Sequence, residues 1–120
     1  MRAIMIILAM LATMTTGAMA DEADDARRRA VSGRDAYWNC LAREYPQNSN
    51  RNMSERDFRA LIASACSSER QNFRVALVDY LGMQSPSHDA DANMTTANDA
   101  IALAQKGVVT AFARRKAASK

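Results

Sequence analysis

The sequence predicts an all-α fold, in which an antiparallel helical hairpin is tied by a disulfide and a third helix completes a small three-helix bundle. Three observations support this fold class. Alanine and arginine are abundant and strand-forming residues are few, a composition that favours helices. Three stretches repeat apolar residues with a period of about 3.6, which is typical of amphipathic helices. The two cysteines of the chain lie on two of these stretches, where one bond can join them.

Residues 1–20, "MRAIMIILAMLATMTTGAMA", have the layout of a signal peptide. Arg2 forms a short basic start, residues 4–11 form an unbroken apolar run, and the segment ends in the small-residue pattern A-M-A that signal peptidase accepts. We therefore expect cleavage after Ala20 and a periplasmic or secreted mature protein. The alternative is a buried apolar N-terminal helix of a cytosolic protein. The apolar run is too short to span a bilayer stably, and no transmembrane segment is expected in the mature chain.

The mature chain, residues 21–120, has a length that suits one helical domain with one core. Cleavage removes Arg2 from the 16 Lys and Arg of the full chain, which leaves 15 of them against 13 Asp and Glu and a net charge near +2. Proteins that bind nucleic acid usually carry a much stronger basic face, so no nucleic-acid partner is expected.

The first helix is expected over residues 22–44. Acidic residues occupy its start, where the positive end of the helix macrodipole stabilises them. Pro46 marks its end. At about 100° per residue, one face collects its apolar side chains, namely Ala30, Tyr37, Trp38, Leu41 and Tyr45.

The second helix is expected over residues 55–81. Ser54 can act as its N-cap, and Asp57 supplies the acid three residues later. Gly82 is placed to end the helix in the left-handed conformation. The apolar stripe of this helix comprises Phe58, Ile62, Ala65, Cys66, Phe73, Ala76 and Tyr80.

The third helix is expected over residues 96–116. Its apolar stripe needs a partner, and we expect it to cover Phe58, Ile62 and Phe73 of the second helix; the alternative is a pairing with another chain. Gly107 weakens its middle by about 1 kcal/mol relative to alanine. The stripe of the third helix comprises Ala97, Ile101, Ala104, Val108 and Phe112.

The segment of residues 82–94 is rich in small and polar residues and is expected to be a flexible linker. His88 lies in this segment beside two aspartates, a combination that occurs in metal sites. A polar linker accounts for the same residues, and we expect no metal ion and no cofactor.

Cys40 lies near the end of the first helix and Cys66 lies on the stripe of the second. In an exported chain with two cysteines on neighbouring antiparallel helices, the simplest expectation is a disulfide between them. The cysteines do not form a C-x-x-C motif, which argues against a thioredoxin-like redox role. Zinc would require two further ligands, and the chain has 1 histidine.

A bond between Cys40 and Cys66 fixes the register of the hairpin, because residues at equal height then have numbers with a constant sum. This register places Gly33 opposite Phe73, a small residue against a large one. It also places Glu69 opposite Tyr37, within reach of Arg34. Because a buried carboxylate needs a partner, we expect Arg34 and Glu69 to form a partly buried ion pair. The alternative is that Glu69, Arg34 and Tyr37 form the site of a small-ligand binder or an enzyme.

The pattern Y-x-x-C-L at Tyr37, Cys40 and Leu41 and the pattern A-C-x-x-x-R at Ala65, Cys66 and Arg70 follow the signal peptide. Together they resemble small exported helical proteins of bacteria. This resemblance implies a disulfide-tied helical hairpin and implies no activity. The chain has 1 histidine, shows no pairing of a nucleophile with a base, and is too small for a deep pocket. The expected role is therefore a non-enzymatic interaction or accessory module of the cell envelope, whose partner is a protein or another envelope component. No catalytic residue is assigned, and the sequence does not define an oligomeric state.

Overall fold

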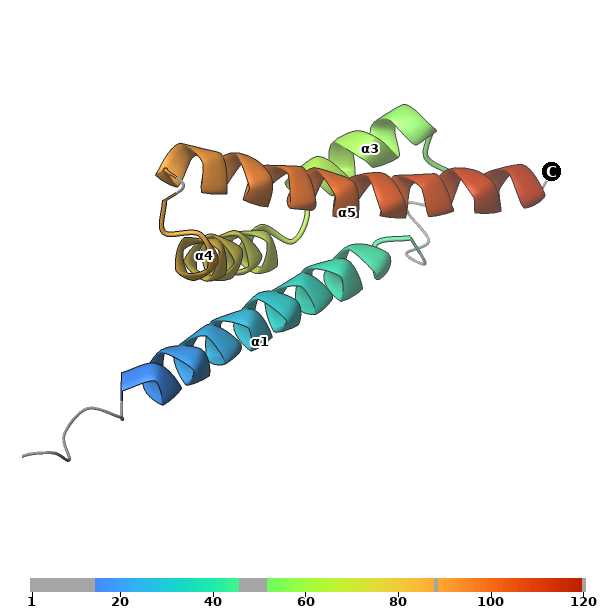
Figure 1. Ribbon diagram of the computed structural model, residues 1–120. Helices are drawn as coiled ribbons and strands as arrows, with labels where there is room; N and C mark the ends of the chain where they lie inside the picture. The colour runs from blue at the N-terminus through green and yellow to red at the C-terminus, as the bar shows by residue number, and fades with distance from the viewer. Residues whose placement is uncertain (1–14, 46–51, 88, 120) are drawn as a thin grey trace, which may run out of the picture.

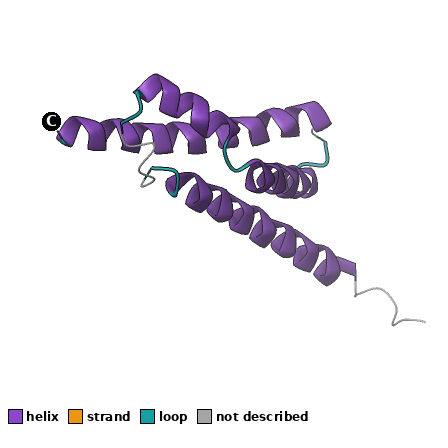
Figure 2. Ribbon diagram, turned by 180° about the vertical axis from the view of Figure 1, so that it is seen from behind, coloured by secondary structure: helices purple, strands orange, loops and turns teal. Residues whose placement is uncertain are grey.

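The computed structural model describes residues 15–45, 52–87 and 89–119. They form four helices, α1 (Thr15–Ala42), α3 (Glu55–Ser64), α4 (Ser67–Gln84) and α5 (Ala90–Ala118) (Figure 1). Within these ranges all regular structure is helical and no strand is present, which confirms the predicted all-α class (Figure 2).

The helix predicted over residues 55–81 is wrong as a single element, because the chain breaks between α3 and α4. Ala65 is extended and Cys66 adopts the left-handed conformation, with φ 57°. Cys66 is the one non-glycine residue of the described ranges with a positive φ, a conformation that costs a non-glycine residue about 1–2 kcal/mol. The break lets the two halves of the predicted stripe serve different partners, since α3 packs on α5 while α4 packs mainly on α1.

The predicted start of the second helix is correct, but its predicted end is not. Its start is confirmed, because the Asp57 backbone N–H donates to Ser54 Oγ at 3.1 Å, so Ser54 caps α3. Its end is wrong, because α4 continues through Gly82 to Gln84 and no glycine in the described ranges has a positive φ. Gly82 is therefore an interior helical residue.

α1 and α4 form the antiparallel hairpin, and their contact is the most extensive between helices in the described structure. The predicted register is confirmed at Gly33, where an added Cβ would lie only 3.1 Å from Phe73 Cα. Glycine therefore lets the two backbones approach closely at this height. Ala26 and Ala30 are buried on the same face of α1, toward its N-terminal end.

α5 lies across the hairpin and α3 and completes the core (Figure 1). It begins six residues earlier than predicted, because Asp89 caps it by accepting a hydrogen bond from the Ala92 backbone N–H at 2.7 Å. Its apolar face is buried against the predicted partners, and the Phe58 and Phe112 rings stack with their centroids 4.0 Å apart. The core cluster comprises Tyr37, Leu41, Phe58, Ile62, Phe73, Ile101, Ala104, Val108, Val109 and Phe112.

Gly107 has a packing role within α5 that its low helix propensity does not reveal. A Cβ added to Gly107 would overlap Cη2 of Trp38 and lie 2.8 Å from its Cζ3. The Trp38 indole of α1 thus rests directly on the backbone of α5. Glycine at this position allows α1 and α5 to approach each other.

None of the helices in the described ranges combines the length and the apolar character needed to cross a membrane.

Candidate functional site

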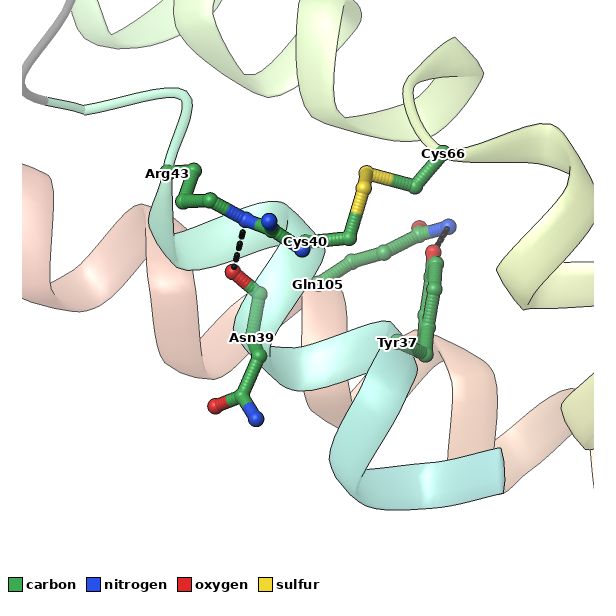
Figure 3. The surroundings of a disulfide bond; sticks show 6 residues. All are labelled: Tyr37, Asn39, Cys40, Arg43, Cys66 and Gln105. Carbon is green, nitrogen blue, oxygen red and sulfur yellow. Dashed lines mark hydrogen bonds between the residues drawn. A yellow bond between two sulfur atoms is a disulfide. The ribbon is translucent and has the colours of Figure 1, made fainter. Parts of the chain in front are cut away.

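The Cys40–Cys66 disulfide and its surroundings form the candidate site (Figure 3). The two Sγ atoms are bonded at 2.01 Å and the Cα atoms lie 6.1 Å apart, as the sequence predicted for this pair. Cys40 lies in the last turn of α1, and Cys66 lies at the break that separates α3 from α4. The bond therefore ties the end of α1 to the joint between two other helices. Both cysteines are partly buried rather than sealed in the core.

Tyr37 lies one turn before Cys40 and is fully buried. Its hydroxyl accepts a hydrogen bond of 3.0 Å from Gln105 Nε2, which reaches it from α5 (Figure 3). Because a buried hydroxyl without a partner costs free energy, Gln105 stabilises this position. The Tyr37 hydroxyl is thus part of the polar interior of the fold.

Two arginines near the disulfide donate to backbone carbonyls. Arg43 Nε donates to the Asn39 carbonyl at 3.3 Å near the end of α1 (Figure 3). Arg70 Nη1 donates to the Ala63 carbonyl, so a side chain of α4 reaches back across the break to the last turn of α3. This hydrogen bond helps hold the joint in its bent form.

Glu69 lies in the first turn of α4, where a carboxylate is stabilised by the helix macrodipole. One of its carboxylate oxygens and the sulfur atoms of Cys40 and Cys66 all lie within 4.8 Å of one another. Glu69 is partly buried, and it makes no hydrogen bond or ion pair with any residue of the described ranges. A half-buried carboxylate therefore faces the disulfide without a counter-charge from the part of the chain that the structure describes.

The predicted ion pair between Arg34 and Glu69 is not formed. Arg34 pairs with its neighbour Asp35 at 3.2 Å, and the two side chains are 53% and 58% exposed. The reason is that the buried face of α1 is centred elsewhere than predicted. Its centre lies between Ala26, Ala30 and Gly33, the small residues on the side of α1 that meets α4. Arg34 lies about 70° from that centre at 100° per residue, so its guanidinium turns to solvent.

The alternative site of Glu69, Arg34 and Tyr37 does not come together in this arrangement. Arg34 is at the surface, the Tyr37 hydroxyl is bonded to Gln105 inside the core, and Glu69 faces the disulfide. Neither of two described hollows includes any of the three. One lies on the outer face of α1, and the other is an open groove of about 230 Å³ between α1 and α4, lined by Ala26, Arg29, Asn72, Val75, Ala76 and Asp79.

His88, the residue considered for a metal site, lies outside the described residues. Two features of the site were not predicted from the sequence. Gln105 reads as an ordinary polar residue of a helix, and no local signal marks it as the partner of Tyr37. The contact of Gly107 with Trp38 does have a signal, since a glycine in the middle of a long helix suggests a close approach.

Comparison with known proteins finds no matching protein-family model, no matching curated protein and no matching solved structure. The class of protein is therefore defined by the fold and the bond alone: a small all-α bundle with one disulfide at the joint between two of its helices.

Proposed function

We propose that the chain is a small exported protein that serves as a non-enzymatic interaction module of the cell envelope. Export follows from the signal-peptide layout of residues 1–20, and the Cys40–Cys66 disulfide agrees with an oxidising compartment. The mature protein then resides in the periplasm or outside the cell. Its partner is a protein or another component of the envelope.

The support for a binding role over catalysis comes from the polar groups that could carry chemistry. The Tyr37 hydroxyl, with its residue 0% exposed, is committed to Gln105, and Arg34 is committed to Asp35 at the surface. A catalytic centre needs such groups to converge on a place that a substrate can enter. In this protein they contribute to the interior and to the solvated surface instead.

Five large apolar residues of the described ranges are exposed, on α1, α4 and α5, and we choose one on α1 and one on α5 as places where a partner can be sought. Val31 lies on the outer face of α1 and is 39% exposed, and Leu103 lies on α5 and is 66% exposed. Leu103 is the most exposed of the large apolar residues in the described ranges. Single exposed apolar residues are common on soluble proteins, so the choice between these faces belongs to experiment.

The test is photo-crosslinking in the native host. A photoreactive amino acid replaces Ser32, beside Val31 on α1, in one variant and Leu103 on α5 in another, and each face serves as the control for the other. We expect a discrete crosslinked species from one face and none from the other. A smear from both faces, or no product from either, would contradict a specific interaction.

Export is tested separately by the intact mass of the protein from its native host. The expected chain begins at Asp21 and contains the disulfide. A full-length cytosolic product with free thiols would contradict the proposal, whatever the crosslinking shows.

A further inference from the structure

We infer that Cys40, Cys66 and Glu69 form a binding site for a thiophilic divalent cation, with Zn²⁺ as the best match, in the form of the protein whose disulfide is open. The three donor atoms already lie within 4.8 Å of one another. The disulfide and the metal are therefore alternative ways to join α1 to the start of α4. This inference does not depend on the proposed envelope role.

The positions of the donors suit chelation. Cys66 is the N-cap of α4 and Glu69 lies three residues later, in the first turn, and their donor atoms lie within 4.8 Å of each other. Cys40 approaches from α1, held in register by the close contact of Gly33 with Phe73. Bonds from Zn²⁺ to sulfur of about 2.3 Å in a tetrahedral arrangement place two sulfurs about 3.8 Å apart. Rotation of the two cysteine side chains provides this separation without a change of register.

The charges of the metal-bound site also suit a divalent cation. Two thiolates and one carboxylate would then lie together in a partly buried place, and a divalent cation between them would offset most of their charge. The arginine of the same helical turn does not neutralise Glu69, because Arg70 donates to the Ala63 carbonyl instead. The Glu69 carboxylate, which forms no ion pair within the described ranges, can therefore serve as a third ligand.

The donor set selects the kind of metal. Two thiolates favour Zn²⁺ and other thiophilic ions over Mg²⁺ or Ca²⁺, and the carboxylate favours a divalent ion over Cu⁺. All three residues are partly exposed, so water can supply the fourth ligand. Three protein ligands and one water describe an open site rather than a closed structural one.

Reduction of the disulfide precedes metal binding. A dithiol reductant supplies two electrons and two protons to the Cys40–Cys66 bond and becomes a disulfide itself. Binding of Zn²⁺ then displaces the two thiol protons. Because free thiols are largely protonated at pH 7, each Zn²⁺ bound releases about two protons.

The experiment uses the mature chain, reduced with dithiothreitol and desalted without oxygen. It is titrated with Co²⁺ as a spectroscopic probe, and then with Zn²⁺ in weak buffer to count protons. We expect one Co²⁺ per chain with thiolate-to-metal absorption, displacement of Co²⁺ by Zn²⁺, and about two protons released. The oxidised chain and the double variant Cys40→Ser with Cys66→Ser should show no such absorption.

Glu69→Gln is the decisive variant, because it keeps the shape of the side chain and removes the anionic donor. It should weaken Zn²⁺ binding by at least about tenfold. Asp79→Asn removes an exposed carboxylate of the same helix and should leave binding unchanged. Equal affinity of the Glu69→Gln variant and the reduced parent would overturn the inference, because the thiols alone would then account for the binding.

Far-UV circular dichroism shows whether the reduced chain that binds the metal is folded or unfolded. If the reduced chain keeps its helices, the titrations report on the folded site. If it loses them, Zn²⁺ should restore the helical signal in the parent and do so at least about tenfold less effectively in Glu69→Gln. Failure of Zn²⁺ to restore the signal would overturn the inference in that case.

Discussion

Replacement of Gly107 by alanine sets two effects against each other within one helix. Alanine is favoured over glycine in a helix interior by about 1 kcal/mol, so the substitution should stabilise α5 if nothing else changes. The new methyl group, however, would meet the Trp38 indole, with Cζ3 only 2.8 Å away. Carbon atoms at rest lie about 3.5–4.0 Å apart, so the ring has to move by about 1 Å.

The cost of that movement decides the sign. Overpacking of a well-packed site typically costs about 1–3 kcal/mol. Trp38 is partly buried and its ring can shift toward solvent, so the cost should fall near the middle of this range. After the gain in helix propensity, Gly107→Ala should lower the free energy of unfolding by about 1 kcal/mol.

The assay is urea denaturation followed by far-UV circular dichroism, with the disulfide intact. Gly82→Ala is the matched control, because Gly82 also lies within a helix but an added Cβ would find no atom within 4 Å. It should raise the free energy of unfolding by about 0.5 kcal/mol, less than the full propensity difference since Gly82 is near the end of α4. Indole fluorescence should change in Gly107→Ala and stay constant in the control.

A double-mutant cycle identifies the indole as the cause. In a Trp38→Leu background the methyl group of Gly107→Ala has room, and the same substitution should become stabilising. If Gly107→Ala stabilises the parent as much as Gly82→Ala does, the proposed contact between α1 and α5 is wrong. The reasoning is equally refuted if the effect of Gly107→Ala is the same with and without Trp38.

Three further predictions use the same denaturation assay. Gly33→Ala should lower the free energy of unfolding by about 1 kcal/mol, because its Cβ would meet the Phe73 backbone, which cannot swing aside, and this cost exceeds the gain in helix propensity; an unchanged midpoint would contradict the close approach of α1 and α4. Arg34→Ala should change the free energy of unfolding by less than about 0.5 kcal/mol, since its ion pair with Asp35 is exposed to solvent, and a loss above about 2 kcal/mol would instead support a buried pair with Glu69. Gln105→Leu should cost about 1–3 kcal/mol because it leaves the buried Tyr37 hydroxyl without its donor, and Tyr37→Phe should cost less because Gln105 can turn to water; the opposite order would show that this hydrogen bond does not stabilise the interior.

Local patterns in the sequence predicted those features of the fold that depend on residues close together in the chain. The apolar period predicted helical structure in all three stretches, although the second divides into α3 and α4. Ser54 predicted the start of α3, and the assumption of one disulfide predicted the contact of Gly33 with Phe73. The contact followed because a single crosslink between antiparallel helices fixes every other pair along them. The burial of the α5 stripe followed because an apolar face needs a partner.

The break at Cys66 could not be predicted in the same way. No proline or glycine marks it, and the apolar stripe continues through it, so local preferences favour an unbroken helix. Tertiary packing overrides these preferences, since α3 contacts α5 and α4 contacts α1. A cysteine in the left-handed conformation is a product of that packing and has no local signal.

The position of Arg34 was predicted wrongly for a different reason. The apolar pattern predicts that Trp38 and Tyr45 lie on the same helical face as Ala30 and Tyr37, which moves the expected centre of that face toward Arg34. In the structure, Trp38 contacts α5 and the ring of Tyr45 packs on Phe112, so both serve a second neighbour of α1. A helix that contacts two partners has a wide apolar face. The centre of that whole face therefore differs from the centre of the part that meets either partner.

The register of the hairpin also bears on proteolysis at the N-terminal end of α1. The same pairing that joins Cys40 to Cys66 brings Gln84, the last residue of α4, level with Glu22. Ala20, Asp21 and Glu22 are exposed, and from Ala20 onward the first buried side chain of α1 is Ala26. The N-terminal end of α1 thus extends past the end of α4 (Figure 1). Local unfolding at the exposed residues 20–22 costs little because few apolar contacts are lost there. If the proposed cleavage after Ala20 takes place on the folded chain, the peptidase has to unwind the exposed residues 20–22, and the core that begins at Ala26 can remain folded during the cut.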